Sequence, residues 1–147
     1  MVELFPTKVL LATDGSDDAV RAARAAVEVS NKTGSELHVV HVATDVPTFL
    51  AHTEVAPERT QEARALLDEQ VRRLEASGAT VAGTHLKTGN AAEGIVTLSE
   101  QLGAGLVVVG SRGLSVWKRA VMGSVSESVV RHAHCPVLVM RHEEPRA

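Results

Sequence analysis

The residues of this sequence best suited to chemistry are the glycines that follow a short apolar segment in its C-terminal third. Residues 106–109 are all apolar and too few for a helix, which predicts a strand buried on both faces. Gly110 ends that segment, Gly113 follows, and Gly123 precedes a short predicted helix. Helix N-termini offer unpaired N–H groups and a positive dipole end, and glycine lets a phosphate approach the backbone closely. The spacing therefore predicts an anion site.

A simpler interpretation explains the same residues without any ligand. Gly110 and Gly113 would form a turn, and Ser124 with Glu127 would form a capping box, S-x-x-E, at the start of the helix. On this segment alone both interpretations remain open. The choice depends on whether the rest of the chain supplies the other half of a nucleotide site.

Two common phosphate-binding patterns are absent. The first predicted strand is followed by ATDGSDD rather than by G-x-G-x-x-G, and no G-x-x-x-x-G-K-[ST] occurs. Any phosphates would therefore be held by backbone N–H groups around Gly110, Gly113 and residues 123–125, with Arg112 adding a positive charge. A few charge-assisted hydrogen bonds of roughly 1.5–3 kcal/mol each would suffice for micromolar binding.

Strand and helix patterns alternate along the chain, and Ser16 and Asn90 are suitable N-caps for two of the helices. The alternation predicts one domain over residues 1–147, an α/β fold with an open parallel five-stranded sheet in the order 3-2-1-4-5 and helices on both faces. The strands are expected at residues 7–13, 37–43, 81–86, 106–109 and Val137–Met140, and the helices at residues 16–31, 58–77, 90–102 and after Gly123.

In such a sheet the winding direction reverses between the first and fourth strands, and ligands bind outside the carboxyl ends of the strands at that point. The two strand exits there would be residues 12–14 and residues 109–110. These segments are remote in sequence but adjacent in the expected fold. Their convergence is the main argument for a ligand site.

The chain resembles the universal stress protein family, specifically its ATP-binding branch. The resemblance runs from KVLLATDGS to CPVLVMR and includes the motif Gly-x-x-Gly, nine residues, then Gly-Ser. It implies a Rossmann-like sheet of the adenine nucleotide alpha hydrolase type, with ATP as the ligand. The residues that it assigns are Ala12, Thr13 and Asp14 to the adenosine side, Val42 to the base through its backbone, Val109 and Gly110 to the ribose, and Arg112, Gly113, Gly123, Ser124 and Val125 to the triphosphate.

The family also suggests a divalent ion, Mg²⁺ or Mn²⁺, bridging the phosphates, with Asp14 as a possible water-mediated contact. Asp14 has an alternative role as a helix-dipole or Asx-turn residue, and both remain open. His38 and His41 alternate to opposite faces of a strand, so they cannot jointly ligate one metal. No metal ligands are assigned from the sequence.

The resemblance favours a nucleotide-dependent sensor or regulator of a stress response, with at most slow ATP hydrolysis. No G-x-S-x-G elbow and no acid–base pair accompany the serines, so no catalytic residues are assigned. Two alternatives remain open. One is an ATP hydrolase or another nucleotide-transforming enzyme on the same fold, and the other is a nucleotide-independent dimeric interaction module.

Composition excludes several classes of partner. The 147 residues are 44% hydrophobic, with a formal net charge of -3 and no long run of Lys or Arg, so nucleic acid and membrane surfaces are not expected as partners. No leader or membrane-spanning segment is recognisable, which predicts a cytoplasmic protein. The single cysteine, Cys135, precludes an internal disulfide and is expected to be a small buried hydrophobe rather than a reactive thiol.

The last predicted strand, Val137–Met140, lies at the sheet edge, where an exposed apolar strand tends to pair with another chain. Relatives pair this strand across a two-fold axis, so a homodimer is expected. Proline at Leu138 is expected to remove a ladder bond and to favour the monomer. Residues 44–57 contain two prolines and form an unusually long connection, and whether it closes over a ligand is left open.

Overall fold

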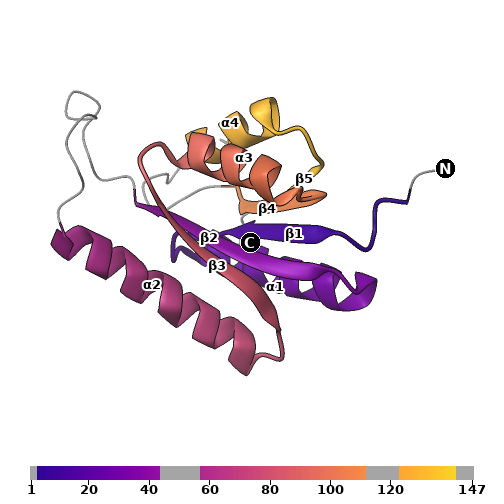
Figure 1. Ribbon diagram of the computed structural model, residues 1–147, viewed down its shortest axis with the longest axis horizontal. Helices are drawn as coiled ribbons and strands as arrows, with labels where there is room; N and C mark the ends of the chain where they lie inside the picture. The colour runs from indigo at the N-terminus through magenta and orange to yellow at the C-terminus, as the bar shows by residue number, and fades with distance from the viewer. Residues whose placement is uncertain (1–2, 44–56, 112–122, 142–147) are drawn as a thin grey trace, which may run out of the picture.

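The computed structural model describes residues 3–43, 57–111 and 123–141, which form a five-stranded parallel sheet with helices on both faces (Figure 1). The strand order β3-β2-β1-β4-β5 confirms the predicted topology. The elements are β1 (Lys8–Ala12), α1 (Asp17–Thr33), β2 (Glu36–Ala43), α2 (Pro57–Ala76), β3 (Val81–Thr88), α3 (Ala91–Leu102), β4 (Leu106–Gly110), α4 (Ser124–His132) and β5 (Val137–Met140).

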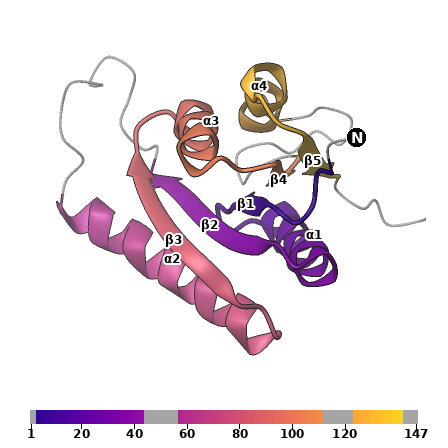
Figure 2. The same ribbon diagram turned by 45° about the vertical axis from the view of Figure 1, so that its right-hand side comes forward.

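Helices α1 and α2 cover one face of the sheet, and α3 and α4 cover the other (Figures 1 and 2). Side chains alternate between the faces, so Val9 and Leu11 pack toward α1 and α2 while Leu10 packs toward α3 and α4. All three side chains are fully buried, as expected for a central strand of a parallel sheet. Within the described ranges, no helix combines the length and apolar character needed to cross a bilayer.

Two helices begin with the side-chain caps that the sequence predicts. The Ser16 hydroxyl accepts a hydrogen bond from the N–H of Ala19 at 3.2 Å, and the Asn90 carboxamide accepts one from Glu93 N–H at 2.9 Å. Each cap satisfies an N–H group that has no acceptor within its helix. The starts of α1 and α3 are therefore closed by the chain itself.

Helix α4 begins differently, and the capping box predicted for Ser124 and Glu127 is wrong. The N-cap is Gly123, one residue earlier, so Ser124 is the first helical residue. Because glycine has no side chain, the N-cap makes no side-chain hydrogen bond. The carboxylate of Glu127 instead pairs with Arg131 one turn further along, at 3.1 Å.

Strand β5 lies at one edge of the sheet, and its hydrogen bonds to β4 determine which of its amides face outward. The carbonyls of Pro136 and Met140 accept from the amides of Val107 and Ser111. Backbone groups alternate sides along a strand, so Leu138 also faces β4 and Val139 faces away from it. The effect expected above for proline at Leu138 is therefore misplaced, because that amide lies on the β4 side rather than at the free edge.

A stacked pair of histidines, one from β2 and one from β3, lies across the pairing of these two strands. The rings of His38 and His85 lie 5.4 Å apart, with His38 Nδ1 at 3.2 Å from His85 Nε2 and His38 Nε2 at 3.4 Å from a carboxylate oxygen of Glu36. Gly83 makes room for this pair, since a Cβ atom there would lie 2.7 Å from His38 Nδ1. Burial, followed by the charges of His38 and Lys87, lowers the pKa of His85 below its ordinary value of 6.5.

This lowered pKa predicts a pH-dependent stability. Below about pH 6.5 the unfolded chain takes up a proton at His85 more readily than the folded protein does, so the free energy of unfolding decreases as the pH falls. We expect His85→Gln to weaken that dependence, and the exposed His132→Gln to retain it. Urea unfolding between about pH 5 and pH 8 measures the slope, and equal slopes for wild type and His85→Gln would contradict the assignment.

Candidate functional site

The carboxyl ends of β1 and β4 lie side by side at the centre of the sheet. The two strands pair in parallel, with Leu11 opposite Val108, and the strand order runs in opposite directions from this pair. Residues 12–14 leave one strand and residues 109–110 end the other. The predicted convergence of these exits is confirmed, and it places them at the switch point where open α/β sheets bind ligands.

Two hydrogen bonds to β2 hold the exit of β1, one through the N–H and one through the carbonyl of Thr13. Its N–H donates to the carbonyl of Val40 at 2.9 Å, and its carbonyl accepts from His41 Nδ1 at 2.8 Å. Asp14 Oδ1 accepts from the N–H of Ser16 at 2.9 Å, which is the Asx turn left open above. Among the described residues the second carboxylate oxygen of Asp14 has no partner, so the turn leaves it available to a ligand or ion.

The exits of β2 and β4 present backbone rather than side chains. Val42 is only 8% exposed, and its side chain packs beneath α3, where a Cβ on Gly94 would lie 3.2 Å from Val42 Cγ2. Val109 is 3% exposed and belongs to the same apolar cluster. A ligand in the crevice would therefore meet the backbone of Val42, Val109 and Gly110.

Helix α4 is anchored to the β4 exit at Ser111. The carbonyl of Ser111 accepts from the N–H of Gly123, and also from the hydroxyl of Ser126 at 2.7 Å. The Ser126 hydroxyl is buried and lies 3.0 Å from the carbonyl of Gly123. These contacts bring the start of α4 to the crevice.

The first turn of α4 is an open set of donors. The N–H groups of Ser124, Val125 and Ser126 occupy positions that have no acceptor within a helix, and among the described residues no side chain caps this terminus. Ser124 and Val125 are exposed. An anion at this terminus would receive backbone hydrogen bonds and face the positive end of the helix dipole, which Glu127 in the same turn offsets in part.

The structure thus brings together, at one edge of the sheet, the predicted site residues that it describes. These are Ala12, Thr13, Asp14, Val42, Val109, Gly110, Gly123, Ser124 and Val125. Arg112 and Gly113 lie outside the described residues, as do residues 44–56 of the long connection. Their parts in the site stay predictions.

Three residues that shape the crevice are not among those predicted from the sequence. His41, which the sequence suggests only as a metal ligand and excludes, holds the Thr13 carbonyl. Ser111 and Ser126 join the β4 exit to α4. The available signals were weak: a histidine directly before Val42, and a serine on the otherwise apolar face of α4.

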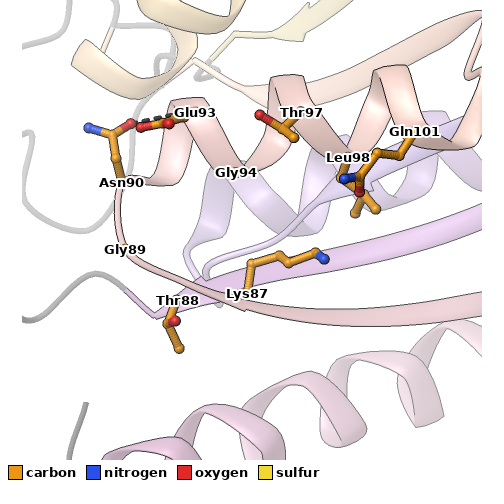
Figure 3. A pocket seen from close by; sticks show the side chains of 9 residues that line it. All are labelled: Lys87, Thr88, Gly89, Asn90, Glu93, Gly94, Thr97, Leu98 and Gln101. Carbon is orange, nitrogen blue, oxygen red and sulfur yellow. Dashed lines mark hydrogen bonds between the residues drawn. The ribbon is translucent and has the colours of Figure 1, made fainter. Parts of the chain in front are cut away.

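A cavity of about 300 Å³ lies between β3 and α3, apart from the crevice (Figure 3). Its lining carries both an ammonium group, from Lys87, and a carboxylate, from Glu93, so its charge favours neither anions nor cations. It shares no lining residue with the crevice. The residues around it are Lys87, Thr88, Gly89, Asn90, Glu93, Gly94, Thr97, Leu98 and Gln101.

Metal and thiol chemistry find little support in the described part of the chain. No group of three or more His, Cys, Asp or Glu side chains there could hold a metal ion. His38 and His41 have separate partners, Glu36 with His85 for the former and Thr13 for the latter, as their predicted opposite faces require. Cys135 is partly buried, and burial raises the pKa of its thiol, which disfavours the reactive thiolate.

The chain is similar to known proteins over most of its length. The model of the universal stress protein family matches residues 6–141. A universal stress protein of Methanocaldococcus jannaschii is 31% identical over 143 residues, which cover 91% of this chain and 81% of that protein.

Solved structures give the same result. The universal stress protein of Archaeoglobus fulgidus in complex with dAMP is 25% identical with a TM-score of 0.72, covering 95% of this chain and 100% of that one. A universal stress protein in complex with cAMP is also 25% identical, with a TM-score of 0.73 and coverages of 93% and 98%. On the family match, the sequence identity and the shared fold, this chain belongs to the universal stress protein family.

Proposed function

We propose that this chain is an ATP-binding universal stress protein that acts as a nucleotide-dependent sensor or regulator, with at most slow ATP hydrolysis. The observation that carries the proposal is the uncapped start of α4 at the switch point of the sheet. Helices α1 and α3 are closed by Ser16 and Asn90, whereas α4 offers its first-turn N–H groups to a ligand. A phosphate group meets those donors and the helix dipole together.

The ligand is proposed to lie across the crevice from β2 to α4. Its base would meet the backbone of Val42, and its phosphates the first turn of α4. The full assignment is Ala12, Thr13 and Asp14 to the adenosine, Val42 to the base, Val109 and Gly110 to the ribose, and Arg112, Gly113, Gly123, Ser124 and Val125 to the triphosphate.

The choice of an adenine nucleotide is supported by two members of the family, whose structures contain dAMP and cAMP. The preference for a triphosphate rests on this chain. A run of N–H groups at α4 that have no side-chain cap among the described residues, together with the charge of Arg112, suits a ligand with more negative charge than a monophosphate.

A divalent ion, Mg²⁺ or Mn²⁺, is proposed to accompany the triphosphate. Asp14 keeps one carboxylate oxygen in its Asx turn, and the other has no partner among the described residues. Hard cations of this kind prefer oxygen ligands and retain much of their water. Asp14 would therefore reach the ion through a water molecule.

Slow turnover follows from the same residues. Asp14 is the one carboxylate among the described residues at the β1 and β4 exits; one of its oxygens accepts from Ser16 N–H, and the other is proposed to hold the water of the ion. No nucleophile–base pair is present among the described crevice residues, so rapid phosphoryl transfer to water lacks a group to position or activate that water.

Nucleotide binding is tested by the thermal unfolding of wild type and Gly123→Val with ATP and Mg²⁺, ADP, AMP or no ligand. At one hundred times its dissociation constant, ATP should stabilise wild type by about 2.7 kcal/mol, a shift of several degrees. Valine is expected to abolish that shift, because its side chain would stand where phosphates approach the backbone.

Asn90→Ala is the matched control, since it alters another helix N-terminus outside the crevice. It should cost about 1 kcal/mol of stability through the lost cap while keeping the full ATP shift. No shift in nucleotide-free wild type would refute ATP binding and favour the interaction module. Phosphate release above roughly 1 s⁻¹ would favour an ATP hydrolase.

We further propose that two copies pair along β5. The strand lies at the sheet edge, its side chains are only partly buried, and no other described strand pairs with its outward amides, which can continue the ladder into a second chain. Pairing across a two-fold axis would place the same strand of both copies in contact.

Val139→Pro tests this interface, because it removes an outward N–H and spares those that bind β4. We expect the wild-type protein and the control Val139→Ala, which retains the amide, to be dimers by light scattering at micromolar concentration. Val139→Pro is expected to shift to the monomer mass. A dimer mass in the proline variant, or a monomeric wild type, would count against pairing along β5.

A further inference from the structure

We propose that His41 is a positioning residue for the base: its imidazole takes the Thr13 carbonyl that the Val42 amide would otherwise use, and so leaves the backbone edge of Val42 open. The identity of what binds at that edge rests on the proposed nucleotide function. The exchange of hydrogen bonds is a property of the free protein and can be tested without a ligand.

The backbone N–H and carbonyl of Val42 point toward the β1 side of β2. On β2, Glu36 donates its N–H to Thr7 of the segment before β1, and the carbonyl of Val40 accepts from Thr13. The carbonyl of Ala43 accepts from Gly89, which follows β3. Because backbone groups alternate sides along a strand, Val42 turns its N–H and carbonyl toward the β1 side.

On the β1 side, the Val42 N–H and carbonyl lie beyond the last hydrogen bond of the β1–β2 ladder. The β1–β2 register ends with Ala12 opposite Val40, and the N–H of Thr13 makes the last ladder bond. In a regular parallel ladder the next bond would run from Val42 N–H to the Thr13 carbonyl. In this structure that carbonyl accepts from His41 Nδ1 at 2.8 Å, and no hydrogen bond from Val42 N–H reaches it among the described residues.

The bond to the Thr13 carbonyl determines which nitrogen of the His41 ring carries hydrogen. A carbonyl oxygen only accepts hydrogen bonds, so Nδ1 of His41 carries the hydrogen and the neutral ring has its lone pair on Nε2. An imidazolium would also carry hydrogen on Nδ1, so this bond does not require a particular charge on the ring.

The position of the open edge is set by packing. The Val42 side chain is held in the apolar cluster beneath α3, against Gly94, and Val42 pairs with Lys87 of β3 on its other side. With side chain and neighbouring strand in place, Val42 offers one donor and one acceptor at a fixed position. That pair suits the edge of a nucleobase, which carries both kinds of group.

Two substitutions separate the donor from the ring. His41→Asn keeps an N–H donor at the same number of bonds from Cα as Nδ1, whereas His41→Leu removes it. The first measurement is amide hydrogen exchange at Val42 in the ligand-free protein. We expect fast exchange in wild type and in His41→Asn, and slowed exchange in His41→Leu, where Val42 N–H closes onto Thr13.

The second measurement is affinity for ATP and for inorganic triphosphate, which has no base. His41→Leu should weaken ATP binding about tenfold, the equivalent of one lost hydrogen bond, and leave triphosphate binding unchanged. His41→Asn should restore ATP binding. A merely structural role would weaken both ligands together and would not be rescued by asparagine.

Three results would overturn the proposal. The first is an equal rate of amide hydrogen exchange at Val42 in wild type and His41→Leu. The second is an equal loss of affinity for ATP and for inorganic triphosphate in His41→Leu. The third is a nitrogen NMR spectrum that places the hydrogen of the neutral wild-type His41 ring on Nε2. The last needs no variant, so it decides even if His41→Leu does not fold. If wild type binds no ATP, the proposed function fails, while the exchange and ring measurements still decide the role of His41.

Discussion

The parallel pairing of β1 with β4 is the constraint on which the rest of this structure depends. The two strands come from distant parts of the chain, and both are apolar on each face, so they must be covered by helices on both sides. Their pairing also makes the chain wind outward in two directions, toward β3 on one side and β5 on the other. The crevice lies where the sheet switches direction, with α1, the helix after β1, on one face and α4, the helix after β4, on the other.

The crevice is lined mainly by backbone at the ends of strands and of one helix. The side chains of Val42 and Val109 belong to the core, so a ligand at these positions meets main chain, and Val109 itself stays in the ladder with β5. At α4 no described side chain caps the first turn, because the N-cap is a glycine. A site of this kind tolerates many side chains but depends strictly on where strands and helices end.

Short polar contacts determine those ends. Ser111 receives both Gly123 and the buried hydroxyl of Ser126, which ties α4 to β4, and His41 ties the end of β2 to the exit of β1. Each contact joins segments that pair or pack only in the folded protein. They explain why polar residues occur at positions where apolar ones would also fit the sheet pattern.

Local patterns in the sequence determined the element order and the caps at Ser16 and Asn90, because apolar periodicity and capping act over a few residues, and the rules for winding a parallel sheet then gave the strand order. The convergence of residues 12–14 with residues 109–110 followed from topology rules alone. Only the tertiary structure decided the N-cap of α4 at Gly123, the inward amide of Leu138 and the bond from His41 to Thr13. Each depends on which neighbour a backbone group faces, and contacts between distant segments exist only after folding.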